Sequence, residues 1–276
     1  MAFNVLALGF DRRHGPRTYD MRYYPVLAAL AVLPAAAMAQ DGAGYVGLEG
    51  GVSFAHHTDY DVAATRVQTV PTGSGLLGQT VTTTDTKYGN GLVADQKAGA
   101  DVDAIAGYDF GMFRLEGELG YKRSRLRGLT ASGALLADTN TAPIAGVTSD
   151  DFRSGKNTRV LSGMVDALFD YDLTPGVRVY GGGGAGRARV KSLGDRDDVW
   201  AFQLIAGAST AITPNIEVGL KYRYFQTQHV HFDGGASFSD AASGTTSVSQ
   251  FAERGRFRSN SLLLSIAYNF GGPAAK

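Results

Sequence analysis

Apolar and polar residues alternate along much of this chain, and this alternation restricts its fold more than any other feature. Residues 113–121 (FRLEGELGY) place phenylalanine, leucine and tyrosine on one face and arginine and glutamate on the other. Residues 216–225 and 262–270 alternate in the same way. A period of two belongs to a β-strand whose two faces meet different surroundings.

Eight segments carry this pattern, and most have about ten residues or more, the length that a tilted strand needs to cross a bilayer. We expect strands at residues 45–54, 101–110, 113–121, 159–171, 177–190, 200–212, 216–225 and 262–270. The predicted fold class is therefore all-β, an eight-stranded antiparallel up-and-down transmembrane β-barrel.

Composition excludes several other classes of protein. Outside the first forty residues, no apolar run approaches the ~20 residues of a membrane-spanning helix. Lys+Arg and Asp+Glu both number 26, so there is no basic excess that would bind nucleic acid. The absence of Cys excludes disulfides, cysteine metal sites and the lipid-modified cysteine of a lipoprotein.

The N-terminus has the layout of a secretory signal peptide. Residues 21–40 (MRYYPVLAALAVLPAAAMAQ) contain a basic start, a short apolar core and a small-x-small cleavage site that ends at Ala39. We expect residues 1–39 to be an N-terminal extension and signal peptide cleaved after Ala39, and residues 40–276 to form a single barrel domain. Translation starts at either Met1 or Met21, and the sequence leaves both open.

Connections between the predicted strands are of two kinds. Tight turns follow the second, fourth and sixth strands and lie together at one end. Long loops lie at the other end, at residues 55–98, 125–157 and 226–257. This plan is typical of a bacterial outer-membrane barrel. The first and last loops are rich in Thr, Ser and Gly, with little to pack, so we expect them to be mobile.

The face opposite the aromatic rows favours a membrane barrel. In residues 200–212 and 262–270 that face carries Ala, Gln, Ile, Gly, Ser, Leu and Asn but no charge, which suits a crowded lumen better than a solvated surface. Aromatic residues also gather near both ends of the strands, as they do at the two interfaces of a bilayer. A secreted lipocalin-like barrel is the alternative.

Five segments carry a family resemblance: GYVGLEGGVSF (44–54), GYDFGMFRLEGELGY (107–121), VRVYGGGGAGRARV (177–190), ITPNIEVGLKYRYF (212–225) and SIAYNF (265–270). In their order and spacing they resemble the opacity-protein and OmpA-type eight-stranded outer-membrane barrels. The resemblance implies an outer-membrane location and insertion guided by a terminal strand that ends in an aromatic residue. Tyr268 and Phe270 match that insertion signal.

Charged residues on the predicted inner faces carry both signs. By strand parity they are Asp101, Asp109, Arg114, Glu116, Glu118, Lys122, Asp166, Arg178, Glu217, Lys221 and Arg223, with Asp103 on the same side. Eight strands leave an interior just large enough for side chains, and buried charges persist only when paired. We therefore expect a paired network that plugs the lumen, and a structural and surface-interaction role. The alternative is a narrow porin-like channel for small solutes or ions.

The remaining motifs favour neither catalysis nor cofactor binding. No His is followed two places later by Ser, the pair used by outer-membrane barrels that deacylate lipid A. The two histidine pairs, at 56–57 and at 229 and 231, lack the rigid frame of a metal site. We expect no enzyme activity, no cofactor, no metal and no nucleic-acid partner. The partners expected for a monomeric barrel are outer-membrane lipid, lipopolysaccharide, the barrel assembly machinery and a surface ligand bound through the long loops.

The turn at residues 111–112 predicts a register between its two strands. A two-residue type II′ hairpin has Gly at its first central position, where φ is positive, and it pairs Phe110 with Phe113. A slip by one residue would send a charged strand face into lipid. On the inner face the predicted ion pairs are Asp109 with Arg114 and Asp101 with Lys122.

Overall fold

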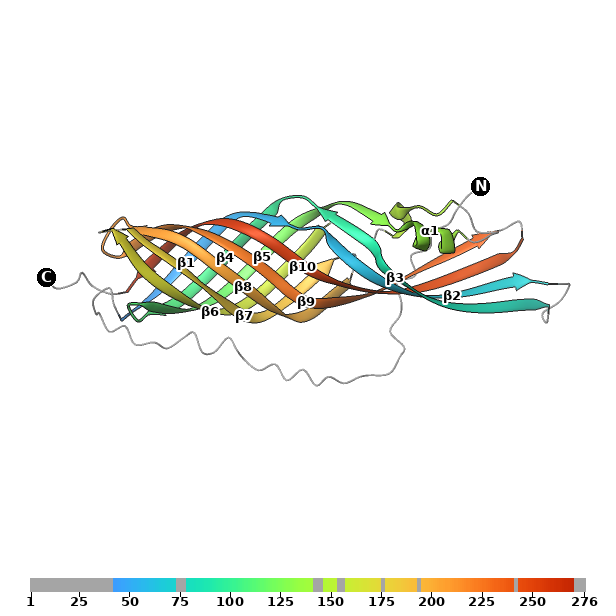
Figure 1. Ribbon diagram of the computed structural model, residues 1–276, viewed down its shortest axis with the longest axis horizontal. Coiled ribbons are helices and arrows are strands. Elements are labelled where there is room, and N and C mark those ends of the chain that lie inside the picture. Colours follow the sequence, from blue (N-terminus) through green and yellow to red (C-terminus); the bar gives the residue numbers. More distant parts are fainter. Residues whose placement is uncertain are drawn as a thin grey trace.

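Ten antiparallel strands form an elongated, closed barrel in the computed structural model (Figure 1). The structure describes residues 42–72, 78–140, 146–152, 157–174, 177–192, 195–240 and 243–270, so the predicted signal peptide and its cleavage site lie outside the described residues. The strands are β1 (Ala43–Ala55), β2 (Thr58–Pro71), β3 (Gln79–Gln96), β4 (Gly99–Asp109), β5 (Phe113–Ala131), β6 (Asn157–Thr174), β7 (Val177–Ser192), β8 (Asp195–Ala211), β9 (Ile216–Asp240) and β10 (Thr245–Asn269).

Eight of these strands close the ring. From β4 to β10 each strand pairs with the next one in the chain, and β1 joins β4 to β10. The predicted antiparallel up-and-down barrel is therefore confirmed. Two short helices, α1 (Gly133–Thr139) and the 3-10 helix η2 (Ser149–Phe152), lie between β5 and β6. Neither helix has the length and apolar character to span a membrane among the residues described.

The first long loop, expected to be mobile, instead forms the hairpin of β2 and β3. β2 pairs with residues 246–254 of β10, and β3 pairs with residues 126–131 of β5. The hairpin therefore continues the barrel wall beyond the ends of β1 and β4. The prediction that the last loop is mobile is likewise wrong, because β9 and β10 have 25 residues each and stay paired far beyond residue 226. The hairpin is ordered because Tyr60, Val62 and Ala64 alternate with exposed residues and pack inward.

The predicted turn and register are confirmed at the end of the barrel where the short turns lie, which we call the turn end. Gly111 has a φ of 97°, and the Phe110 N–H donates to the Phe113 carbonyl at 2.9 Å. The two rings stack with their centroids 4.6 Å apart. Asp109 lies opposite Arg114 in the ladder, so turn chemistry sets the pairing of β4 with β5.

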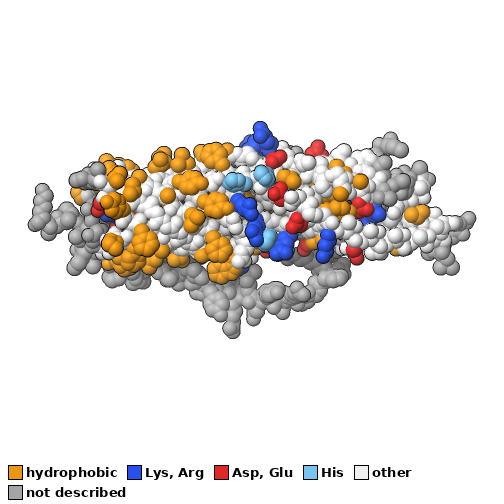
Figure 2. All heavy atoms as spheres, in the orientation of Figure 1, with side chains coloured by type: hydrophobic (Ala, Val, Ile, Leu, Met, Phe, Trp, Pro, Cys, Tyr) orange, Lys and Arg blue, Asp and Glu red, His pale blue; other side chains and the backbone are white. Residues whose placement is uncertain are grey.

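An apolar band covers the outside of the turn-end half of the barrel (Figure 2). The alternation in sequence becomes an alternation in exposure: Leu48 is 65 % exposed, Leu204 64 % and Leu264 69 %. Beyond this band, toward the opposite or loop end, Figure 2 shows Lys, Arg and His side chains and then a mixed polar surface. The outer surface therefore has the polarity of a membrane segment joined to a water-exposed one.

The interior of the loop-end half is apolar. Side chains from many strands fill it, and the rings of Phe225 and Phe257 meet edge to face with centroids 6.3 Å apart. Helix α1 covers this core with Leu135, which is 1 % exposed, and its N-terminus is capped by the Ser132 hydroxyl, which accepts from the Leu135 N–H at 3.2 Å. The polarity therefore reverses along the barrel axis. The outside is apolar in the turn-end half, and the interior is apolar in the loop-end half.

Candidate functional site

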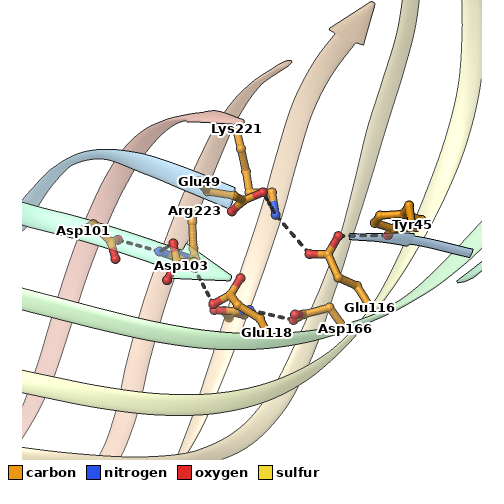
Figure 3. Close-up of polar contacts among 10 residues, drawn as sticks. Tyr45, Glu49, Asp101, Asp103, Glu116, Glu118, Asp166, Lys221 and Arg223 are labelled. Atoms are coloured by element: carbon orange, nitrogen blue, oxygen red, sulfur yellow. Dashed lines mark hydrogen bonds and ion pairs between the residues drawn. The ribbon is translucent and has the colours of Figure 1, made fainter. Parts of the chain in front are cut away.

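A layer of charged side chains crosses the bore within the turn-end half (Figure 3), and we call it the charge layer. All nine members are at most 4 % exposed. The acidic ones are Glu49 of β1, Asp101 and Asp103 of β4, Glu116 and Glu118 of β5, and Asp166 of β6; the basic ones are Lys122 of β5 and Lys221 and Arg223 of β9.

Arg223 is the central cation of the charge layer. Its Nη2 lies 2.6 Å from Asp101 Oδ2 and 2.7 Å from Asp103 Oδ2, and its Nη1 lies 2.5 Å from Glu118 Oε1. A guanidinium presents several donors in a fixed plane, so one side chain can bind three carboxylates at once. Arg223 therefore ties β9 to β4 and β5 across the bore.

Lys221 makes the second crossing. Its Nζ lies 2.6 Å from Glu49 Oε1 and 3.1 Å from Glu116 Oε1, while the Tyr45 hydroxyl donates to Glu116 Oε2 at 2.9 Å. Lys122 pairs with Asp101 at 3.3 Å, as the predicted register implies. Two cations of β9 thus reach acids of β1, β4 and β5.

A smaller set of ion pairs lies nearer the turn end. The predicted pair of Asp109 with Arg114 is wrong, although the two residues are opposite in the ladder. Arg114 turns instead to Asp170 of β6 at 2.8 Å, and Asp109 pairs with Arg178 at 2.8 Å. The Arg114 guanidinium also lies over the Tyr180 ring, 4.7 Å from its centroid, in a cation–π contact.

All eleven residues predicted from parity lie at inward positions, and Arg178 and Glu217 are the two that remain half-buried. Sequence reasoning missed Glu49, Asp170, Tyr45 and Tyr180, which belong to the same interior. The signal was available, because Glu49 and Tyr45 alternate with the outward Val46 and Leu48 of β1. The inner face of β1 carries one charge, so its pattern is weaker than those of β5 and β9.

One cavity lies between the charge layer and the turn end. Its volume is about 20 Å³, room for about one water molecule. Glu49, Glu116 and Lys221 line its inner end, and Arg114 and Glu217 line it closer to the turns. On the other side of the charge layer the apolar core fills the bore, starting at Phe225, whose ring centroid is 4.6 Å from Lys122 Nζ.

A belt of exposed cations follows the apolar band on the outer surface, and we call it the cationic collar. Among the outward-facing residues of β5, Tyr121 of the apolar band is followed by Arg123. On β6, Leu161 of the band is likewise next to Arg159. Neighbouring strands place Arg123 beside Arg159, Arg159 beside Lys191 and Lys191 beside Arg196. The collar also includes Arg125, Arg187, Arg189, Arg254, Arg256 and Arg258.

The histidines lie at the level of the collar and make local contacts. His56 Nε2 lies 2.8 Å from the Asn260 amide, and His231 Nδ1 lies 3.7 Å from Asp197. Across the ranges that the structure describes, the groups with ligand atoms close enough for a metal contain only carboxylates of the charge layer. Beyond the collar, burial and, after it, the nearby carboxylates Asp195 and Asp233 together raise the pKa of Glu253 to about 7.

A family model matches most of the chain, and solved structures with low sequence identity resemble it. A family model described as an outer membrane protein beta-barrel domain matches residues 26–270. Among solved structures, Neisserial surface protein A shares 16% identity over 83% of this chain and 99% of its own, with a TM-score of 0.39. OprG from Pseudomonas aeruginosa shares 14% over 84% of this chain and 98% of its own, with a TM-score of 0.41. No curated protein matches the sequence.

Proposed function

The chain belongs to the outer membrane protein beta-barrel domain family, and from this premise we propose that it is a non-enzymatic surface protein with a plugged lumen. The barrel anchors a rigid projection of β2, β3, β9 and β10 that meets partners outside the cell. Its turn end faces the periplasm, as in bacterial outer-membrane barrels in general. Residues 1–39 direct export and are cleaved after Ala39, and Tyr268 and Phe270 guide insertion by the barrel assembly machinery.

The observation that carries the plugged lumen is the filling of the bore by two successive layers. The charge layer crosses the membrane part of the bore, and its Arg223 and Lys122 are 0 % and 2 % exposed. The apolar core follows directly, with Phe225 and Leu263 both at 0 %. An ion that crossed would have to separate buried ion pairs and then enter an apolar interior, and both steps are costly.

Planar-bilayer recording tests the plug. The refolded barrel should give no steady conductance. Phe225→Ala together with Phe257→Ala should also stay closed, because the charge layer still crosses the bore. Steady single-channel currents from the wild-type barrel would favour the alternative, a narrow channel for small solutes or ions.

The cationic collar supports lipopolysaccharide as the lipid partner. Arg123, Arg159, Lys191 and Arg196 lie side by side on the outer face, where like charges repel each other. Phosphate groups at the level of the lipid headgroups would relieve this repulsion and accept charge-assisted hydrogen bonds from Arg. The collar begins one outward residue beyond the apolar band, which is the depth at which headgroups lie.

Binding of lipopolysaccharide tests the role of the collar. The double variant Arg123→Ser with Arg159→Ser should bind lipopolysaccharide at least several-fold more weakly than the wild type, when both proteins are refolded into vesicles that contain it. Lys87→Ser, which removes an exposed cation of β3 far from the collar, is the control. Equal binding by the double variant and the control would refute the partner proposed.

A further inference from the structure

The charge layer is not balanced. It holds six acidic and three basic side chains. Arg223, Lys221 and Lys122 between them pair with Asp101, Asp103, Glu118, Glu49 and Glu116. Asp166 pairs with no basic side chain within the described part of the chain, although it is 0 % exposed. A buried carboxylate without a counter-charge is costly, so a positive charge is missing beside Asp166.

The geometry around Asp166 concentrates this deficit. Glu116 and Asp166 are direct neighbours across the β5–β6 ladder, and both point into the bore (Figure 3). One carboxylate oxygen from each of Glu116, Glu118 and Asp166 lies within 4.8 Å of the others. Like charges at that spacing repel strongly when water is excluded.

Two of these carboxylates also have oxygens without partners. Asp166 Oδ1 accepts from Gln203 Nε2 at 2.7 Å, but Asp166 Oδ2 has no hydrogen-bond partner, and neither has Glu118 Oε2. The side-chain oxygen of Gln203 is buried and unpartnered as well. Buried polar atoms are normally satisfied, and these oxygens of Asp166 and Glu118 are free to accept a ligand.

We propose that Glu116, Glu118 and Asp166 bind one divalent cation, Mg²⁺ or Ca²⁺, inside the lumen. Both are hard cations that take oxygen ligands, and carboxylates are the side chains that they prefer. One such ion supplies two of the three missing positive charges. The site goes beyond the surface role proposed above and holds whether or not the lumen conducts.

A second group of acids, Glu49, Asp103 and Glu118, has the same spacing but a different environment. Lys221 already lies 2.6 Å from Glu49, and Arg223 lies 2.7 Å from Asp103. Glu118 belongs to both groups and pairs with Arg223, so all three acids of the second group have a cation beside them, whereas Asp166 has none within the described part of the chain. The group that contains Asp166 is therefore the one that binds the ion.

The cavity gives this site its entrance. Glu116 lines the cavity, whose other walls lead past Glu217 and Arg114 toward the turn end. The apolar core closes the bore on the opposite side. The cation therefore enters and leaves from the turn end, and exchange is slow because Lys221 and Tyr45 both bind Glu116 beside the path.

Metal content and thermal unfolding of the refolded full barrel test the proposal. After equilibrium dialysis against CaCl₂ or MgCl₂, the wild type should retain about one ion per barrel, and EDTA should lower its unfolding temperature. Asp166→Asn should lose at least tenfold in affinity and should unfold at the same temperature with and without EDTA. Glu253→Gln, which changes a buried acid outside the charge layer, is the control and should keep the ion.

Three results would overturn the proposal. The first is a wild-type barrel that retains neither ion and shows no effect of EDTA. The second is ion retention that Asp166→Asn leaves unchanged. The third is an infrared band of a protonated carboxyl that is present in the metal-treated wild type and absent from Asp166→Asn, because it would assign the missing charge to a proton. If Asp166→Asn does not refold, Glu118→Gln replaces it, with the same expected loss.

Discussion

Replacing Arg223 by Met should lower the free energy of unfolding by about 5 kcal/mol. Removing one partner of a buried ion pair costs about 3–5 kcal/mol, because the other charge is left unpaired. Arg223 is 0 % exposed and binds three carboxylates at 2.5–2.7 Å, so the loss lies at or above the upper limit of that range. Met fills a similar volume without a charge, so the change measures electrostatics more than packing.

Urea unfolding in lipid vesicles measures this change, followed by the fluorescence of Trp200, the chain's single tryptophan, which lies on the outer face. Arg125→Met is the matched control, because Arg125 is an exposed arginine, and it should change the stability by less than about 1 kcal/mol. Adding Glu118→Gln to Arg223→Met should restore about 1–3 kcal/mol. A loss below about 1 kcal/mol for Arg223→Met would refute the assignment of Arg223 as the central cation.

Three further changes test other parts of the barrel. Gly107→Ala should destabilise by about 1–3 kcal/mol in urea unfolding, because its Cβ would lie 2.5 Å from a tyrosine ring of β1, whereas Gly163→Ala meets nothing within 4 Å and should be neutral. The pKa of Glu253 is raised from 4.5 to about 7 in the folded state, so unfolding free energy should fall by up to about 3 kcal/mol as the pH rises through 4.5–7. Glu253→Gln should remove that part of the pH dependence, and an unchanged profile would contradict it. Phe270→Ala should reduce the amount of barrel in isolated outer membranes, measured by immunoblot, while Ile266→Ala on the same exposed face should not.

The faces of the strands could be predicted because alternation is a local property. Once Phe113 and Leu115 were assigned to lipid, Arg114 and Glu116 had to point inward, and the structure places them there. The turn at Gly111 then determined which residues of β4 and β5 are opposite. Neither inference needs any knowledge of distant parts of the chain.

Partner choice inside the bore could not be predicted, because it depends on side-chain reach across the barrel. Arg223 of β9 binds Asp101, 122 residues away in the chain, and no pattern in either strand indicates that contact. For the same reason, Arg114 binds Asp170 and not Asp109, which lies opposite it in the ladder. The candidate cation site is a further case, because its missing charge becomes visible only after every pairing is known.

The hairpin of β2 and β3 was missed for a different reason. Its Thr-rich sequence resembles loop composition, although Thr is β-branched and favours strands. The inward alternation of Tyr60, Val62 and Ala64 was the stronger signal. Within the membrane the inward residues of a strand are polar, whereas beyond the membrane they are apolar. The sequence pattern of a strand in the membrane therefore does not identify a strand that lies beyond it.

The continuation of β9 and β10 beyond the collar places the tip of the sheet at a set distance from the membrane surface. Nine residues of β10, at 245–253, lie beyond the last collar arginine, Arg254, which corresponds to a height of about 20–25 Å for a tilted strand. Ladder hydrogen bonds to β2 and β9 hold that height constant. A surface partner that binds the tip, as proposed above, would therefore be held at that height above the headgroups and could not approach the bilayer without unpairing the sheet.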